Sequence, residues 1–462
     1  MKGTYKVFHA IGLFILKMWV TIAIRAYFRK IRVRGIEKIP TDAPVIFAPN
    51  HQYAFMDAMV VATVNKRIPY FLVRADIFQT PLANFMLRAL RMMPVYRLRD
   101  KVDVMAKNED IFNKCVEILL KRKHLIIFPE GNHSKIRRIR TIRKGIMRIA
   151  FRAIKEDDSI DDLVIIPVGI NYDNHSKFQS DLFIQFGDPI RVRDYKNSYH
   201  NNQSKTFSDM AARIYQSLTR LTVNINNADS YKFYENVLKI YTPHFMRKLR
   251  MSYKNLIERF NAYKRIITGM DHISNAGRDE FKRFEAANNR FFKQRLKSNF
   301  DPVYLGRHFD SRLQKFKNYA GLLLFWPIYI YGLVNNLPAL FLPYIISKFT
   351  VRDDHWDSSV KLAIGLLSFP LCYTIQSLIF YRFFPDGWLV LLYLLSIIIT
   401  GILAKIYQEW IHRFWESFKI WILRTSKKRD YVRIRNSYNQ LIQKLDSSLL
   451  KVPEKADGLE QE

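Results

Sequence analysis

The chain has 462 residues, of which 74 are Lys or Arg and 41 are Asp or Glu, so its formal net charge is +33. A charge of this size favours a polyanionic partner, either nucleic acid or an anionic membrane surface. The two cysteines, Cys115 and Cys372, lie far apart, which gives no basis for a disulfide framework or a cysteine-based metal site and fits a reducing compartment. Aromatic residues are 14% of the chain, which suits a bilayer interface and favours the membrane.

The N-terminal segment is basic and apolar. Its first 36 residues contain eight Lys or Arg and no acid, and the mostly hydrophobic stretch 7–26 includes Lys17 and Arg25. No small-residue cleavage site follows, which argues against a removed signal peptide. We therefore expect residues 1–30 to form a membrane-docking helix, with its apolar face in the acyl region and its cations at the headgroups.

Two short apolar runs, 45–47 and 125–128, are typical of buried strands. Asn50, His51 and Asp57 follow the first run, and Glu130 and Gly131 follow the second. In open α/β sheets, sites form at the edge where the carboxyl ends of the strands meet. We therefore expect these residues to lie at one edge of a sheet.

His51 and Asp57 predict a base held by a carboxylate. On one helix they would point apart, because six residues turn through about 600°. We therefore expect His51 in a turn and Asp57 in the first turns of a helix that reaches Val64. The carboxylate would fix the imidazole tautomer, so that the other ring nitrogen could take a proton from an alcohol attacking an acyl group. Taken alone, such a pair is more often a capping or surface pair.

Further along the chain, four blocks occur in an order that resembles the glycerolipid acyltransferase family. The resemblance covers about residues 30–195, less than half of the chain, and as a set it is specific. The blocks are Asn50-His51 with Asp57, then 71–78 with 93–97, then Phe128-Pro129-Glu130-Gly131 leading to Lys144-Gly145, and finally 164–170.

The resemblance implies roles for these residues. His51 would be the general base and Asp57 its orienting carboxylate. Glu130 and Gly131 would help to place the glycerol backbone. Arg74 and the basic run after Gly131 would hold the acceptor phosphate, because arginine suits a phosphate through bidentate bonding. The substrate-binding candidates in this run are His133, Arg137 and Lys144. No metal or cofactor is expected, because the acyl thioester co-substrate, acyl-CoA or acyl carrier protein, is already activated.

Two departures from the family pattern concern the site. Five residues separate His51 from Asp57, where most members have four and a minority branch shares five. His133 stands where the third block normally has Arg, which leaves the phosphate ligand open. Residues 131–152 carry eight Lys or Arg and no acid. We expect Arg140, Arg148 and Arg152 in this run to face lipid headgroups or solvent.

The C-terminal half changes character. Residues 209–318 are rich in Lys, Arg, Phe, Tyr and Asn and are compatible with amphipathic helices. Segments 319–346, 360–381 and 388–406 are each long enough to span about 30 Å of hydrocarbon. Cations crowd both flanks, so the positive-inside rule places both in the cytoplasm. We therefore expect the first segment, which contains three prolines and Asn335-Asn336, to be a broken or re-entrant hairpin that restores an even number of crossings.

The predicted fold is an α/β acyltransferase domain, a mixed sheet flanked by helices, followed by a helical segment and a C-terminal transmembrane region. The expected domains are 1–30, 31–208, 209–318, 319–410 and a tail at 411–462. The predicted protein is an integral membrane O-acyltransferase with its catalytic domain on the cytoplasmic face. It would use a glycerol-phosphate acceptor, contact anionic lipids and bind no nucleic acid. Two alternatives are an acyltransferase for a lysolipid without phosphate, such as a lyso-amino-acid lipid, and a non-catalytic basic membrane scaffold.

Overall fold

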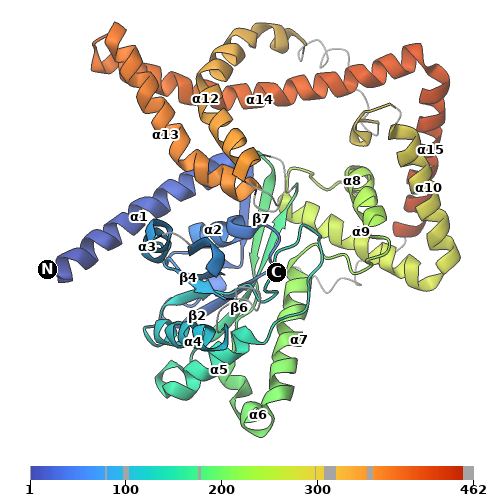
Figure 1. Ribbon diagram of the computed structural model, residues 1–462. Coiled ribbons are helices and arrows are strands. Elements are labelled where there is room, and N and C mark those ends of the chain that lie inside the picture. Colours follow the sequence, from blue (N-terminus) through green and yellow to red (C-terminus); the bar gives the residue numbers. More distant parts are fainter. Residues whose placement is uncertain are drawn as a thin grey trace. The chain divides into compact units, whose positions relative to one another are not determined.

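The structure is a computed structural model that describes residues 2–78, 81–96, 104–174, 178–296, 298–305, 319–350 and 357–450. The chain divides into two compact units (Figure 1). The first contains Met1–Asn224 and Ser347–Leu366, and the second contains Ile225–Ile346 and Leu367–Glu462.

The first unit is built on an eight-stranded mixed sheet with the order β1-β7-β6-β2-β5-β3-β4, in which β8 pairs with β6. Strands β6, β2, β5, β3 and β4 run parallel, while β7 is antiparallel to β6 and parallel to β1. This confirms the predicted mixed sheet. The strands are β1 Lys30–Arg34, β2 Val45–Pro49, β3 Tyr70–Arg74, β4 Met92–Val95, β5 His124–Ile126, β6 Val164–Tyr172, β7 Asp181–Phe186 and β8 Ile190–Arg191.

Helices cover both faces of this sheet. Strand β2 is buried along its whole length because its side chains alternate between two cores. Val45 and Phe47 enter the core formed with α1 and α2, whereas Ile46 enters the core formed with α4, α5 and α7. The helices are α1 Lys2–Tyr27, α2 Ala54–Val64, α3 Pro81–Ala89, α4 Val104–Leu120, α5 Gly145–Glu156, α6 Lys196–Asn201 and α7 Gln203–Leu221.

The first unit extends further than the sequence predicts. The expected boundary between residues 208 and 209 falls inside α7. Met210, Ile214 and Leu218 of α7 are fully buried in the same core as Ile46 of the sheet. A boundary at 208 would expose this apolar stripe of a helix that packs on β6, and the unit ends instead at Asn224.

Helix α1 packs on the first unit along one face. Leu13, Val20 and Ile24 are buried there, and the Lys17 ammonium donates to the carbonyl of Asn65 at the end of α2. The opposite face leaves Phe14 and other apolar side chains exposed. Among the residues described, four helices are long and apolar enough to cross a membrane, namely His9–Tyr27, Trp326–Phe349, Val360–Phe383 and Gly387–Ser426.

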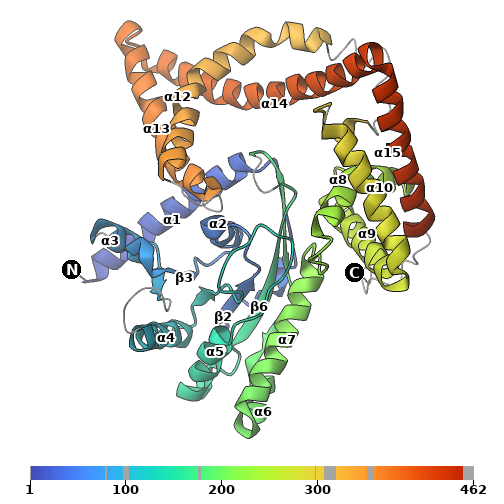
Figure 2. The same ribbon diagram turned by 45° about the vertical axis from the view of Figure 1, so that its right-hand side comes forward.

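The second unit is helical. Helix α15 packs along α8, α9 and α10, and Figures 1 and 2 show it beside α10. Asp446 of α15 accepts hydrogen bonds from three side chains of α8, with distances of 2.8 Å from Tyr241 Oη, 3.0 Å from His244 Nε2 and 2.9 Å from Lys248 Nζ. The helices are α8 Tyr231–Lys248, α9 Leu256–Ala276, α10 Arg278–Leu296, α14 Gly387–Ser426 and α15 Lys428–Leu449.

The predicted segment 319–346 is interrupted at Phe325, but it forms no hairpin, because α12 continues as one helix over Trp326–Thr350 with two prolines inside it. Pro343 cannot donate to the carbonyl of Ala339, and the Ser368 hydroxyl of α13 (Asp357–Phe383) donates to that carbonyl instead, at 2.9 Å. Asn336 donates within α12 to the carbonyl of Gly332 and across to that of Ile397 in α14. Neighbouring helices thus satisfy the groups that were expected to break this one.

Packing within the second unit bears on membrane topology. Helices α8–α10 precede the apolar helices and α15 follows them, yet α15 packs on all three. If α12, α13 and α14 enter a membrane, this packing predicts that the two flanks lie on the same side of it. Lys315, at the predicted basic flank, lies outside the described residues.

We expect cysteines introduced as Lys293→Cys on α10 and Lys428→Cys on α15 to behave alike. In intact cells both should resist a membrane-impermeant thiol reagent, and both should react after permeabilisation, because the positive-inside rule predicts that both flanks are cytoplasmic. Cys115, whose pKa is raised to about 12 by burial, and the buried Cys372 would first be replaced by Ala. Labelling at only one of the two positions would contradict the prediction that both lie on the same side of the membrane.

Candidate active site

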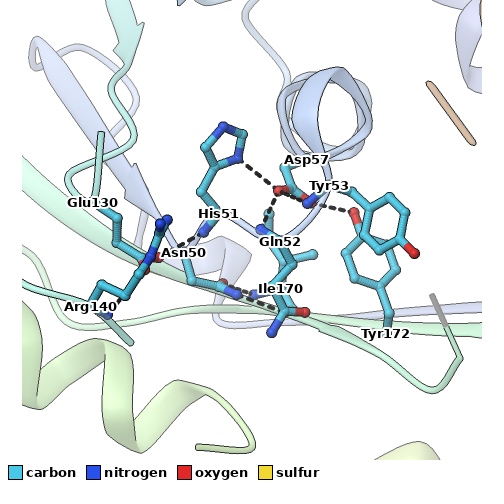
Figure 3. A network of polar contacts seen from close by, with 9 residues as sticks. All are labelled: Asn50, His51, Gln52, Tyr53, Asp57, Glu130, Arg140, Ile170 and Tyr172. Atoms are coloured by element: carbon cyan, nitrogen blue, oxygen red, sulfur yellow. Dashed lines mark hydrogen bonds and ion pairs between the residues drawn. The ribbon is translucent and has the colours of Figure 1, made fainter. Parts of the chain in front are cut away.

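His51 and Asp57 take the positions that their spacing predicts. His51 lies in the turn after β2, and Asp57 lies in the first turn of α2. His51 Nδ1 is 2.9 Å from Asp57 Oδ2 (Figure 3). The Asp57 side chain is fully buried, whereas 12% of the His51 side chain is exposed. In the described part of the chain, His51 Nε2 has no hydrogen-bond partner, so it is available to a substrate.

The Asp57 carboxylate is held by three further donors. Oδ2 accepts the backbone N–H groups of Gln52 and Tyr53, each at 2.7 Å, and Oδ1 accepts the Tyr172 hydroxyl at 2.7 Å. Hydrogen bonds to the charged form of a carboxylate stabilise that form. Two of the five residues between His51 and Asp57 thus anchor the carboxylate that orients the base.

Two residues of strand β6 hold the turn and the carboxylate of the His51–Asp57 pair. Tyr172, the last residue of β6, is buried, and burial followed by the charge of Asp57 raises its pKa well above the ordinary value. Its hydroxyl therefore stays protonated and donates. Asn50, 1% exposed, pairs with the backbone of Ile170 in β6, accepting its N–H at 2.6 Å and donating to its carbonyl at 3.1 Å. Sequence reasoning gave no role to Tyr172, whose only signal is its place just after the fourth block.

Tyr172→Phe should lower kcat by roughly three- to tenfold, because Asp57 loses a donor worth on the order of 1 kcal/mol net. The charge of Asp57 would then act more strongly on the His51 imidazolium, so the acidic limb of the pH–rate profile should move to higher pH. Tyr234→Phe is the matched control, since it removes a Tyr–Asp hydrogen bond of 2.6 Å to Asp271 in the second unit. An unmoved pH profile would contradict the positioning role of Tyr172.

Glu130 lies beside His51 with both carboxylate oxygens engaged. Oε1 accepts the backbone N–H of His51 at 2.9 Å. Oε2 accepts Arg140 N at 3.1 Å and Arg140 Nε at 3.0 Å (Figure 3). Gly131 follows with a φ of 73°, the left-handed region that glycine adopts without steric cost. Glu130 therefore fixes the turn that carries the base, while its contact with glycerol stays a prediction.

Two rings border the base. Phe128 stacks on His51 with centroids 3.8 Å apart, and His133 approaches it edge-on at 5.4 Å. Phe128 and His133, both from the third block, thus lie against the imidazole of His51. At the position where the resemblance implies an arginine, His133 places a ring beside His51.

The predicted phosphate ligands have different surroundings. Arg74, at the end of β3, forms a two-pronged ion pair with Asp76. Arg137 Nη2 donates to the carbonyls of Tyr172 and Asp173, at 3.2 and 2.9 Å. Lys144 is exposed at the start of α5. Their roles in binding phosphate stay predictions.

Arg140 differs most from its expected surroundings of headgroup or solvent. Its guanidinium is aligned by Glu130 beside the His51 turn, and its Nη2 is buried with no hydrogen-bond partner among the described residues. Leaving a buried donor unpaired costs about 1–3 kcal/mol, which an anionic ligand would relieve. In the residues described, no group of three His, Cys, Asp or Glu could hold a metal ion.

The region that contains His51 and Glu130 matches known proteins. Residues 30–171 match the family model described as Acyltransferase. Over 138 residues, or 30% of this chain and 36% of the relative, the sequence is 30% identical to 1-acyl-sn-glycerol-3-phosphate acyltransferase LPAT1, chloroplastic, of Arabidopsis thaliana. Over 57% of this chain and 46% of the relative, it is 21% identical to glycerol-3-phosphate O-acyltransferase 1 of Saccharomyces cerevisiae. The chain thus spans less than half the length of these two relatives.

Among solved structures, the 1-acyl-sn-glycerophosphate acyltransferase PlsC of Thermotoga maritima matches with 21% identity and a TM-score of 0.33, over 47% of this chain and 89% of that one. The mixed sheet and the matched sequence define an acyltransferase domain. Residues 30–171 are thus similar to acyltransferases, including relatives that act on glycerol phosphates.

Proposed function

We propose that this protein is a membrane-bound O-acyltransferase that moves a fatty acyl group from acyl-CoA or acyl carrier protein to a hydroxyl of glycerol 3-phosphate or 1-acylglycerol 3-phosphate. The observation that carries the proposal is the His51–Asp57 pair, in which Asp57 occupies Nδ1 and leaves Nε2 to the acceptor. The similarity to a 1-acyl-sn-glycerol-3-phosphate acyltransferase and a glycerol-3-phosphate O-acyltransferase supports the substrate class.

The proposed reaction needs one base and one proton. His51 Nε2 takes the proton of the acceptor hydroxyl as its oxygen attacks the thioester carbonyl carbon. The buried Asp57 stabilises the imidazolium that forms. The tetrahedral intermediate then collapses, the carbon–sulfur bond breaks, and the thiolate leaves with the proton returned by the imidazolium. The products are the ester and the free thiol.

Arg140 is the residue that we propose for the acceptor phosphate, in the role that the arginine missing at His133 would fill. Glu130 holds its Nε and backbone N–H, so the guanidinium is already oriented, and its buried Nη2 still needs an acceptor. An oriented guanidinium binds phosphate through directional, charge-assisted hydrogen bonds. Arg74 stays a proposed second ligand, although Asp76 already occupies its two-pronged face.

Arg140→Gln should raise the KM for a phosphorylated acceptor about tenfold to a hundredfold, because a lost charge-assisted contact costs roughly 1.5–3 kcal/mol. Arg74→Ala should act in the same direction with a smaller effect. Both would be measured by initial rates with 1-acylglycerol 3-phosphate and with a lysolipid that has no phosphate. Arg148→Gln, in the same basic run but exposed on α5, is the matched control and should leave KM unchanged. Equal losses with both acceptors would remove Arg140 from the phosphate site.

A second candidate is acyl transfer to a lysolipid without phosphate, such as a lyso-amino-acid lipid. It is favoured by His133 in place of arginine and by the carbonyl and carboxylate partners of Arg137 and Arg74. An assay of the purified protein with glycerol 3-phosphate, 1-acylglycerol 3-phosphate and a lyso-amino-acid lipid in parallel separates the two. Turnover of the third substrate alone would overturn the phosphorylated acceptor.

The membrane role is also proposed. We place the first unit on the cytoplasmic face, with α1 docked by its exposed apolar side and the net positive charge directed at anionic lipids. The four long apolar helices support membrane association. A non-catalytic scaffold would not need a buried carboxylate with four donors behind a histidine.

A further inference from the structure

A basic cavity lies at the edge of the sheet opposite His51. Its volume is about 460 Å³, within the range of about 300–1,000 Å³ that is usual for small-molecule sites. Five cationic residues line it, and they are Arg67, Arg91, Lys121, Arg122 and Lys123. Nothing in the proposed acyl transfer uses this cavity.

The sheet topology separates the cavity from the catalytic turn. The cavity lies at the amino ends of parallel strands, with Asp42 shortly before β2, His124 first in β5 and Arg91 directly before β4. His51 and Glu130 follow the carboxyl ends of β2 and β5. A strand of five residues at about 3.3 Å per residue spans roughly 16 Å, so one ligand phosphate cannot occupy both places.

Two of the cavity arginines occupy a backbone conformation that favours glycine. Arg91 and Arg122 have φ values of 62° and 53°, and they end α3 and α4 through N–H bonds to the carbonyls of Arg88 and Leu119. Glycine is usual at such a helix end because it has no Cβ to clash. The helix dipole favours cations at these two ends, but it does not account for Lys123 or for His124, which also line the cavity.

Carboxylates offset only part of the cavity charge. Asp42 pairs with Arg67 at 3.1 Å, Asp162 with Arg122, and Glu117 with Lys121 at 3.8 Å. Arg91 donates to the carbonyl of Ile68 and lies over the Tyr70 ring. Arg91 and Lys123 have no carboxylate partner in the described part of the chain. Two positive charges are therefore left over, which matches one phosphate monoester dianion.

His124 adds a donor that lacks an acceptor. Its residue is 3% exposed, Nδ1 is 3.5 Å from the Asn65 amide nitrogen, and Nε2 is buried without a partner in the described ranges. Burial, and then the charges of Arg67 and Lys123, lower its pKa to about 4, so the ring is neutral at physiological pH. If the Asn65 amide donates to Nδ1, the proton lies on Nε2. A buried donor of this kind is normally paired with an acceptor, which a ligand oxygen would supply.

The geometry points to a second phosphate site, in which this cavity binds a phosphate monoester through Arg91, Lys123 and His124, apart from the catalytic centre. The ester belongs either to a soluble metabolite or to a phospholipid headgroup. The headgroup is within reach because Lys17 of the apolar helix α1 donates to the carbonyls of Asn65 and Lys66, directly before Arg67.

The test is equilibrium binding of radiolabelled inorganic phosphate to the purified full-length protein in a non-ionic detergent at constant ionic strength. Arg91→Gly combined with Lys123→Gln removes both unpaired charges, and glycine suits the backbone at position 91, so loss of folding is not expected. This pair should weaken binding at least tenfold. The matched control combines Arg250→Gly, at another arginine with a positive φ of 57°, with Lys282→Gln on α10, both exposed in the second unit, and should bind normally.

Arg140→Gln separates this site from the catalytic one and should also keep the binding. Phosphate binding that survives the Arg91/Lys123 pair in an Arg140→Gln background, or that is lost in Arg140→Gln alone, would overturn the proposal. Displacement of the label by phosphatidate in phosphatidylcholine nanodiscs identifies a headgroup as the occupant, and displacement only by soluble phosphate monoesters identifies a metabolite. Displacement by sulfate as readily as by either ester would show an adventitious ion only and would also overturn it.

Discussion

His51→Ala should abolish acyl transfer while the protein still folds and inserts into membranes. The only base in the proposed mechanism is the Nε2 atom of His51, and general-base catalysis contributes about 10²–10⁴ in rate. Its removal leaves Glu130 bound to the backbone N–H of residue 51, so the turn should persist. The measurement is kcat on purified protein with the thioester donor and 1-acylglycerol 3-phosphate, beside thermal unfolding to establish folding.

His244→Ala is the matched control for this variant. His244 also pairs with an aspartate, Asp446 at 3.0 Å, but it lies in the second unit and joins α8 to α15. It should lower the unfolding temperature and leave kcat per folded protein near that of the parent. Near-normal turnover of His51→Ala would show that the assigned mechanism is wrong.

Asp57→Asn should lower kcat by roughly a hundredfold, which is less than the effect of His51→Ala, because the base remains but loses its orienting charge. An amide cannot stabilise the imidazolium as a carboxylate does. The variant should also be less stable by about 1–3 kcal/mol, since the N–H groups of Gln52 and Tyr53 and the Tyr172 hydroxyl lose a charged acceptor in a fully buried place.

Two measurements distinguish these effects, namely kcat below the unfolding temperature and the unfolding temperature itself. Asp446→Asn, which changes a partly buried acceptor of three α8 donors in the second unit, should show the stability loss without the loss of kcat. An Asp57→Asn protein that is folded and fully active would remove Asp57 from the mechanism. A folded variant as inactive as His51→Ala would mean that the carboxylate does more than orient.

Much of the site could be predicted because its parts are local. The apolar run 45–47 and the six-residue step from His51 to Asp57 require a strand, a turn and a helix start, and the structure has all three. The second apolar run likewise predicts a strand that ends shortly before Glu130, and the structure has this strand, β5, directly beside β2. The hairpin prediction failed where prolines and asparagines interrupt an apolar segment. The prolines and asparagines of α12 suggested a hairpin. However, the Ser368 hydroxyl on a neighbouring helix donates to the backbone carbonyl that Pro343 leaves unpaired, and the Asn336 side chain donates to the carbonyl of Ile397 on another.

By itself, then, the sequence determined the α/β class, the edge that carries the base, and the presence of long apolar helices, because each follows from the periodicity or spacing of nearby residues. Only the tertiary structure decided which distant groups complete the site. Tyr172 reaches Asp57 across 115 positions, and α15 returns to α8 across 202 positions between His244 and Asp446. It also decided that α7 belongs to the first unit and that Arg140 is held by Glu130. Such pairings depend on how strands and helices pack, and no local spacing encodes them.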